Sequence, residues 1–327
     1  MIRLFAKCAS HAHAFVPSVR SSARSFIHCT CASARVFVHC VCILCILLLL
    51  PSCEKSVIDS DSAINGSPAD KDANLRVTVF QIENTPFGNI TRAEKSVSDA
   101  CTRLNFAIYN KEGTRVKQVN QTSAEADFGK ASFQLENGDY LLVVVGHSSN
   151  GNPTMNDPTC IKFTNKQGFT DTFICSGTVT IADDPIDYKV SLDRIVALCR
   201  FVITDDFPSD ITKLRFYYTG GSGAFDATTG LGCVNSKQEV KFDITATQKQ
   251  FDLYTFLHDT TGTIHLIVTA LDASGVEIAQ REFDVPMQQN YITWLSGAFF
   301  NGSGSSSTDV TKVTVNTDWA GENHITF

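Results

Sequence analysis

The sequence predicts an all-β protein with two β-sandwich domains in tandem. From Leu75 onward, short runs of alternating apolar and polar residues are bounded by Gly, Asn, Asp and Ser, which is typical of strands and turns. Beyond the N-terminal leader, no stretch keeps apolar residues at helical spacing over three turns. Strands at such regular spacing favour sandwiches over helical or α/β folds.

The first domain, residues 74–194, begins with a predicted strand and a predicted hairpin. The two arms of the hairpin flank Asn110–Gly113, a turn in which glycine supplies a positive φ. A later run, 139–145, is apolar on both faces, so we expect it at the centre of a sandwich. The strands predicted for this domain are 75–82, 104–109, 114–119, 131–135, 139–145, 178–181 and 188–192.

The turn before the central run has a recognisable pattern. Leu135, Gly138 and Tyr140 are spaced as in immunoglobulin- and transthyretin-like sandwiches, where a tyrosine hydroxyl holds the turn. We therefore expect the Tyr140 hydroxyl to bond to this turn.

The second domain, residues 195–327, has the same texture. No flexible linker precedes it near Arg194, so we expect the two domains to abut. Its predicted strands are 196–203, 213–218, 239–244, 250–256, 263–271 and 276–283, with a turn at 273–275 between the last two. The Gly-rich segment Thr219–Ala224 is predicted to be a loop. A flexible stretch, 301–307, precedes a terminal strand, Val310–Val315, expected to pair in its own sheet.

An apolar run from Val36 to Pro51 precedes these domains. It is shorter than the roughly 20 residues that a spanning helix needs, and it matches the apolar core of a secretion signal. Leu50-Pro-Ser-Cys53 resembles a bacterial lipobox, with cleavage between Ser52 and a lipid-modified Cys53. The sequence thus predicts a lipoprotein signal at 1–52. An ordinary cleaved signal or a short membrane anchor are the alternatives.

Residues 1–35 are unusual for such a signal. They contain five basic residues, no acidic residue and many Ser, Ala and His, a composition also typical of organellar transit peptides. A transit peptide followed by a lipobox makes little sense. We therefore hypothesise that translation starts downstream of Met1, at a codon other than Met, because the next Met is Met155.

The mature chain would begin at Cys53. Residues 53–73 are rich in Ser, Asp and Asn and predict a flexible tether. Removing the leader leaves about 275 residues, with 22 basic residues against 34 acidic ones, a net charge of −12. Phosphates repel such a chain, which argues against nucleic-acid binding.

Five cysteines remain after Cys53. They are Cys101, Cys160, Cys175, Cys199 and Cys233. Their wide spacing gives no Cys-x-x-Cys pair for zinc or redox chemistry. One or two disulfides, or buried thiols, are both open, and burial is favoured for Cys199 because it lies in an apolar run.

No catalytic, metal or cofactor motif is found. The histidines form no metal-ligand pair, Gly-x-Ser-x-Gly is absent, and we expect His265 to be exposed on a strand. The acidic pairs Asp183-Asp184 and Asp205-Asp206 are predicted to be solvated turn residues beside prolines. We expect the protein not to be an enzyme and to need no cofactor.

An ordered set of motifs between about residues 75 and 300 resembles the FimB-type fimbrial anchor family of Bacteroidales. The motifs are Cys101-x-x-Leu-x-Phe106, Gly138–His147, Leu192–Ala197, Tyr218–Ser222 with Thr229–Gly232, Tyr254–Phe256, and Val285-Pro with Asn290-x-x-Thr293-x-x-x-Gly297-x-Phe-Phe300. The resemblance implies two transthyretin-like sandwiches and an outer-membrane lipid anchor at the base of a type V pilus. It also implies attachment and length control of the shaft. The long leader departs from the family pattern.

The resemblance implies fimbrial shaft subunits as partners, joined by strand addition. The outer membrane would be bound through the lipid. Two rivals are a fimbrial tip or adhesin subunit and a glycan-binding surface lipoprotein. The latter needs exposed aromatic residues, for which Trp294 and Trp319 are the only tryptophans. A hydrolase is a third alternative, without a nucleophile or metal motif to support it.

Overall fold

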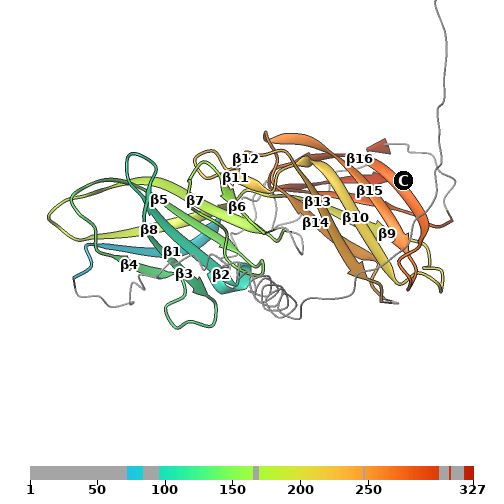
Figure 1. Cartoon of the computed structure of the whole chain (residues 1–327), viewed down its shortest axis with the longest axis horizontal. Coiled ribbons are helices and arrows are strands. Elements are labelled where there is room, and N and C mark those ends of the chain that lie inside the picture. The colour runs from blue at the N-terminus through green and yellow to red at the C-terminus, as the bar shows by residue number, and fades with distance from the viewer. Residues whose placement is uncertain (1–71, 84–95, 165–168, 246, 302–308, 311–319) are drawn as a thin grey trace, which may run out of the picture. The chain divides into compact units, whose positions relative to one another are not determined.

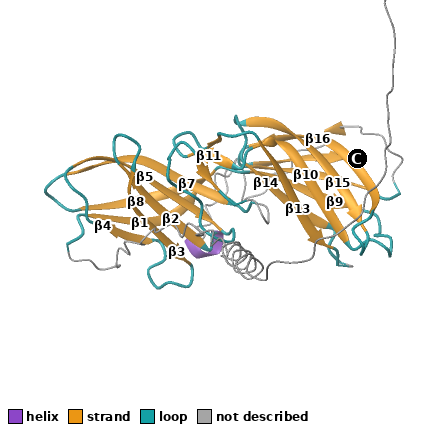
Figure 2. Ribbon diagram, viewed as in Figure 1, coloured by secondary structure: helices purple, strands orange, loops and turns teal. Residues whose placement is uncertain are grey.

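The protein is almost entirely β (Figures 1 and 2). The computed structural model describes residues 72–83, 96–164, 169–245, 247–301, 309–310 and 320–327. The helix α2 (Val97–Ala100) makes a single turn. The first strands are β1 (Leu75–Glu83), β2 (Arg103–Tyr109), β3 (Arg115–Thr122), β4 (Lys130–Phe133), β5 (Gly138–His147), β6 (Ile161–Lys162), β7 (Thr172–Ile181) and β8 (Ile186–Arg194).

The second half of the chain supplies two larger sheets. Their strands are β9 (Ala197–Ile203), β10 (Lys213–Gly221), β13 (Ser236–Asp243), β14 (Gln250–Thr255), β15 (Thr261–Leu271), β16 (Glu277–Gln288), β17 (Tyr291–Gly297), β18 (Asp309–Val310) and β19 (Gly321–Thr326). Two short strands, β11 (Ala224–Asp226) and β12 (Leu231–Gly232), join β6 in a small sheet of order β12-β11-β6.

The first sandwich is a seven-stranded sheet of order β3-β2-β5-β7-β8-β1-β4. Strands β7 and β8 pair only at Phe173↔Arg194 and Ile174↔Asp193. Side chains from both ends of the sheet share one buried cluster, including Val77 of β1 and Phe106 of β2. The sheet therefore folds over on itself at the β7–β8 corner and closes a core between its two halves.

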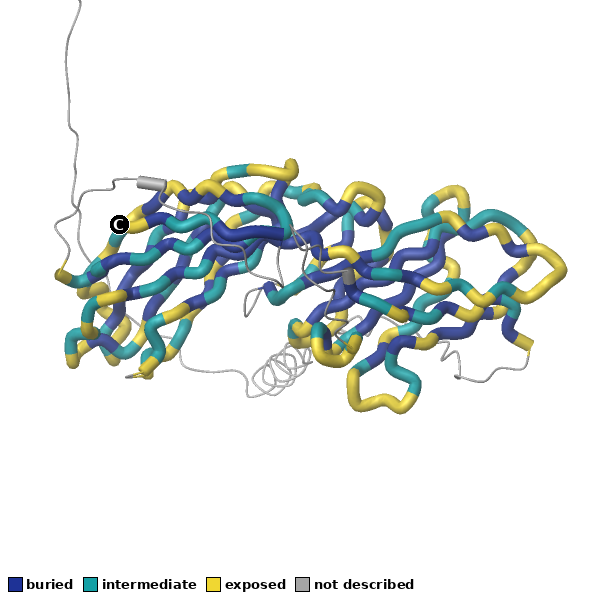
Figure 3. Tube along the Cα trace, turned by 180° about the vertical axis from the view of Figure 1, so that it is seen from behind, coloured by how far each residue is buried: buried dark blue, intermediate teal, exposed yellow. Residues whose placement is uncertain are grey.

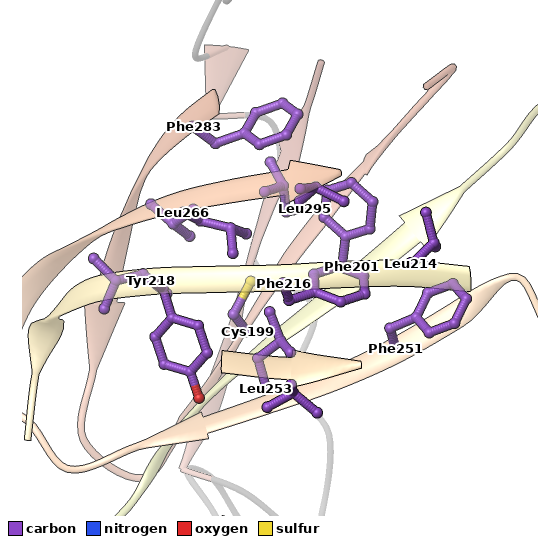
Figure 4. Packing of buried hydrophobic residues seen from close by; sticks show 14 of the residues in the cluster. Cys199, Phe201, Leu214, Phe216, Tyr218, Phe251, Leu253, Leu266, Phe283 and Leu295 are labelled. Carbon is purple, nitrogen blue, oxygen red and sulfur yellow. The ribbon is translucent and has the colours of Figure 1, made fainter. Parts of the chain in front are cut away.

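The second sandwich packs a four-stranded sheet, β13-β10-β15-β16, against a five-stranded sheet, β14-β9-β17-β19-β18. Its core is rich in phenylalanine (Figure 4). Phe201 of β9 contacts Phe216 of β10 edge to face at 5.4 Å between ring centroids. Such aromatic pairs add to the stabilisation that burial provides. Cys199 is fully buried here, as expected from its apolar run, and burial raises the pKa of its thiol to about 12.

The predicted strands are largely confirmed, and the exposed residues lie mostly in the loops between them (Figure 3). The Tyr140 hydroxyl donates to the Glu136 carbonyl at 3.1 Å, which confirms the tyrosine-held turn. Gly113 and Gly275 have positive φ in the predicted turns. The described start of the terminal strand, β18, pairs with β19 in its own sheet, while residues 311–315 lie outside the described residues.

The expected loop at Thr219–Ala224 is wrong. Strand β10 continues to Gly221 and β11 begins at Ala224, so only Ser222 and Gly223 connect them. The glycines do not mark a turn here. A Cβ on Gly221 would lie 1.9 Å from the Thr255 hydroxyl, so glycine is needed for two strands to approach closely. Strands β6, β11, β12 and β19 were also not expected from the sequence.

Candidate functional surfaces

The predicted lipidation site precedes the described part of the chain. Ser52 and Cys53, with most of the tether 53–73, lie outside the described residues. Cleavage and lipidation of this segment stay predictions. In the described part of the chain, no helix is long and apolar enough to cross a membrane.

The central strand β5 is buried on both faces, as its sequence predicts. Leu142 and Val144 belong to the core of the first sandwich. Val143 and Val145 point the other way, into a third apolar cluster. That cluster also contains residues of the second half of the chain, among them Leu198, Phe225, Phe256 and Ile292. The only sign in the sequence that both faces of β5 would be covered was its continuous run of apolar residues.

Next to the third cluster, a buried ion pair fixes the chain where it passes from β8 to β9. The Arg194 guanidinium donates twice to the Asp171 carboxylate, at 2.7 and 2.8 Å, and once to Asn290 Oδ1, at 3.2 Å. Asn290 has a φ of 61°, and its N–H donates to the Val196 carbonyl. We name this group the Arg194 joint. Arg194 and Asn290 belong to the motifs that carry the resemblance, so those motifs have structural roles here.

A row of side chains crosses the outer face of the five-stranded sheet. Asp252 of β14, Arg200 of β9, Trp294 of β17 and His324 of β19 are register partners in turn. Arg200 donates to both Asp252 oxygens at 2.8 Å and lies 4.9 Å from the Trp294 ring centroid. His324 stacks on Trp294 with 5.5 Å between centroids and 6° between planes.

The two neighbours of Trp294 in this row cover its ring from two sides. Strand β17 lies between β9 and β19, so Arg200 and His324 flank the indole on opposite sides. The indole Nε1 is buried without a hydrogen-bond partner. Sugar-binding tryptophans offer an open face, and Trp294 does not. Trp319 lies outside the described residues.

The histidines do not come together into a site. His147 is fully buried, and its Nδ1 accepts from the Ser149 N–H, so Nε2–H donates to Asn105 Oδ1 at 2.9 Å. His265 is exposed on β15 as expected, beside Asp284 of β16. Throughout the described ranges, no three His, Cys, Asp or Glu side chains are grouped to hold a metal ion.

The expectation for Asp205 is wrong in part. Its neighbour Asp206 is exposed as predicted and pairs with Lys249. Asp205 is half-buried and accepts three backbone N–H groups, from Phe299, Phe300 and Asn301, at 2.7–2.8 Å. Burial of the carboxylate disfavours its charge, but these bonds outweigh burial and lower its pKa. Asp183 and Asp184 are exposed turn residues, as expected.

Eight strands lie at sheet edges in the described structure, two in each of the four sheets, and they differ in charge. β13 presents exposed Lys237, Glu239 and Lys241, and β16 contains Pro286, features that protect edges from pairing. β14 has a single charged residue, Asp252, which Arg200 neutralises. Its edge is the least protected of the longer ones.

A family model matches residues 68–326, from before β1 to the end of β19. The chain belongs to this family. It is described as a family of unknown function, DUF6562. The match does not extend to FimB-type anchors, so that finer resemblance stays a prediction. No curated protein matches the chain.

Solved structures described as adhesin or fimbrial proteins are similar to the chain. A candidate adhesin from Bacteroides ovatus has a TM-score of 0.42 and 12% identity, over 60% of this chain and 88% of that one. The fimbrial anchor protein Mfa2 from Porphyromonas gingivalis has a TM-score of 0.36 and 12% identity, over 63% and 80%. A fimbrial assembly protein from Parabacteroides distasonis has a TM-score of 0.33 and 14% identity, over 68% and 89%. Similarity of this degree assigns no function.

Proposed function

We propose that the protein is a lipid-anchored fimbrial subunit of the outer membrane, exposed at the cell surface, that holds the shaft of a type V pilus and limits its length. The observation that carries the proposal is the order of parts along the chain. A predicted lipobox cysteine, Cys53, is followed by a predicted tether and then by two β-sandwiches that contain no recognisable reaction chemistry in their described residues. The fimbrial assignment comes from the ordered motifs that resemble FimB-type anchors.

The lipid would supply the hold on the membrane. Each buried methylene contributes about 0.8 kcal/mol, so a single chain binds reversibly and several chains resist removal. A lipobox cysteine carries more than one acyl chain. The sandwiches would then supply the surface to which the shaft subunits bind.

The shaft would join by strand addition to an open sheet edge. In this mode main-chain hydrogen bonds give affinity and alternate side chains give register. We propose the β14 edge as the acceptor, since Gln250–Thr255 carries no unpaired charge while β13 and β16 are protected.

Hydrogen exchange on the complex tests the acceptor edge. Binding of a shaft subunit should slow the exchange of the outward-facing β14 amides by at least tenfold and leave the edge amides of β13 unchanged. Slowed exchange at β13, with β14 unchanged, would contradict the choice of edge but not the anchor role.

Deleting the gene tests the anchor role. Cells without the protein should release fimbriae into the medium or carry longer ones, seen by electron microscopy of cells and supernatant. Fimbriae of normal length that stay on the cells would rule the role out. Immunogold labelling at the base of the fimbria would support an anchor, whereas labelling at the far end would support the tip alternative.

Replacing the lipidated cysteine tests the attachment. Cys53→Ala should abolish incorporation of labelled palmitate and leave the leader uncut. The matched variant Cys175→Ala changes a cysteine of the first sandwich and should incorporate palmitate normally. Equal labelling of the two variants would contradict lipidation at Cys53.

The glycan-binding alternative has less support. The faces of Trp294 are taken by Arg200 and His324, so this tryptophan has no free ring for a sugar. A glycan array with the purified protein discriminates the two functions, because specific binding of one glycan class would favour the lectin alternative.

A further inference from the structure

Two cysteines lie against each other in the small sheet β12-β11-β6. Cys160 comes just before β6, and Cys233 comes just after β12. Their sulfur atoms are 3.3 Å apart, although the residues are 73 positions apart in the sequence. Of the five cysteines in the described ranges, only these two have their sulfurs in contact.

Backbone hydrogen bonds hold both cysteines in place, so their positions do not depend on a disulfide. Near Cys160, the Ala227 N–H donates to the Pro158 carbonyl at 2.8 Å. The Cys233 N–H donates to the Ala224 carbonyl at 3.2 Å, and the preceding Gly232 N–H donates to Leu257 at 2.7 Å. Strand β11 pairs with β6 on one side and β12 on the other. The two cysteines are therefore held next to the two edge strands of one small sheet, on either side of β11.

The other described cysteines are unsuited to pairing. Cys101 and Cys199 are fully buried in the cores of separate sandwiches. Cys175 lies on β7 and packs against the first core. Cys233 is exposed and Cys160 is half-buried, so an oxidising protein can reach this pair.

We propose that Cys160 and Cys233 form a structural disulfide in the mature protein. The inference rests on the proposed function in one respect, since it requires export to an oxidising compartment. The sulfurs need to approach by little more than an ångström to reach the bonded distance of about 2.05 Å. The bond would close a chain segment that starts in the first predicted domain and ends in the second.

The reaction is thiol–disulfide exchange with a disulfide-bearing thiol oxidase of the cell envelope. The thiolate of one cysteine attacks the oxidase disulfide and releases one oxidase thiolate, giving a mixed disulfide. The second cysteine, after losing its proton, displaces the second oxidase sulfur. The protein gains one S–S bond and loses two protons and two electrons, and the oxidase gains them as two thiols.

The Cys233 thiol is not activated for attack at neutral pH. Although Cys233 is exposed as a residue, partial desolvation of its sulfur and the hydrogen bond to Cys160 raise the pKa of the thiol to about 12. A thiol with a raised pKa is a poor nucleophile at neutral pH. The pair is therefore unlike a catalytic dithiol, which needs a lowered pKa.

The bond would matter for a protein under tension. β6 is supplied by the chain between β5 and β7, and β12 by the chain after β10. Without the bond, a pull on one sandwich would be resisted by the hydrogen bonds of the small sheet, the third cluster and the Arg194 joint. A covalent link between β6 and β12 would keep the small sheet closed under load.

Peptide mapping tests the bond directly. The full chain is isolated from the cell envelope in the presence of a thiol-alkylating agent and cut with trypsin without reduction. Cys160 and Cys233 then fall in separate fragments, 131–162 and 216–237, each with one cysteine. We expect these fragments to be joined and to separate on reduction.

Serine variants provide an independent measurement. Cys160→Ser, Cys233→Ser and the double variant should each lower the unfolding midpoint by roughly 5–10 °C, and dithiothreitol should lower that of the unchanged protein equally. Dithiothreitol should not affect the double variant. Cys175→Ser is the matched control and should keep the full response to the reductant. An unchanged protein that does not respond to dithiothreitol would contradict the bond.

Oxidation in a glutathione redox buffer separates this inference from the proposed function. We expect the purified, reduced protein to form the Cys160–Cys233 bond in this buffer. If the cysteines are alkylated in the envelope sample but bonded after oxidation in the buffer, the two thiols are placed to form the bond, and the proposed location in an oxidising compartment is contradicted. Alkylated or glutathione-capped cysteines in both would overturn the inference and leave the anchor role standing.

Discussion

His147 shows how a single residue can couple this fold to pH. It is fully buried, and burial, together with the charge of Arg103, lowers its pKa from 6.5 to about 4. The unfolded chain therefore binds a proton more readily than the folded one between pH 6.5 and pH 4. The contribution of neutral His147 to stability is complete above pH 6.5 and is lost as the pH falls toward 4.

The size of this effect follows from the two pKa values. At pH 5, protonation of this group alone lowers the free energy of unfolding by roughly 2 kcal/mol. We expect urea unfolding to show that loss between pH 7 and pH 5. His147→Gln should be less stable at pH 7 and should lose less on acidification, while the exposed control His265→Gln should behave as the unchanged protein. Parallel pH profiles for all three proteins would contradict this role.

Asp205 illustrates a residue whose structural role the local sequence concealed. Its carboxylate accepts hydrogen bonds from the backbone N–H groups of residues 299–301. Asp205→Ala leaves these donors without a partner and should cost about 2 kcal/mol in the free energy of unfolding. Asp206→Ala is the matched control, and because it removes only a surface ion pair, we expect a change below about 0.5 kcal/mol. Denaturant unfolding at pH 7 measures both; equal losses would refute the distinction.

The residues that sequence could predict are those decided by local pattern. Cys199 was expected to be buried because its neighbours are apolar, and His265 to be exposed because it alternates with Ile264 and Leu266. Asp205 looked like a turn residue because its partners lie 94–96 positions away. Distant partners leave no mark in the flanking sequence.

At the scale of the strand, one glycine led to a wrong prediction. Gly221 suggested a loop, yet it lies inside β10, where it lets β10 approach Thr255 of β14. Gly221→Ala should cost about 2 kcal/mol, since the added Cβ would clash with a short, fixed side chain. Gly262→Ala, in β15, is the matched control, because its Cβ would meet only ordinary contacts, the nearest at 3.5 Å. Thermal unfolding of both variants is the measurement, and similar midpoints would contradict the close approach.

The length of the apolar pattern decided which strands were predictable. β5 and β15 are long, and both were predicted as strands; the pattern of β5 also showed its central position and its burial on both faces. β6, β11 and β12 have two or three residues each, too few for a period of two to be visible. The small sheet that brings Cys160 to Cys233 was therefore not predictable, although both cysteines were known from the sequence.

At the scale of the whole described chain, the two sandwiches share side chains. The third cluster takes Val143 and Val145 from one and Leu198 and Ile292 from the other. The sequence predicted that the domains abut, from the lack of a linker near Arg194. It could not predict the Asp171 and Asn290 partners of Arg194, which are 23 and 96 positions away.

These shared contacts should make unfolding cooperative across both sandwiches. The third cluster and the Arg194 joint are lost together if either sandwich unfolds, so we expect one calorimetric transition.

Arg194→Ala removes the two hydrogen bonds that the guanidinium donates to the Asp171 carboxylate, in a site where the arginine side chain is 5% exposed. We expect it to lower stability by about 3 kcal/mol and to split or broaden the transition. Arg200→Ala removes a comparable two-bond pair from the outer face of one sheet, so it should lower the midpoint without splitting the transition. Two transitions in the unchanged protein would contradict the coupling, because they would mean that each sandwich unfolds without disturbing the other.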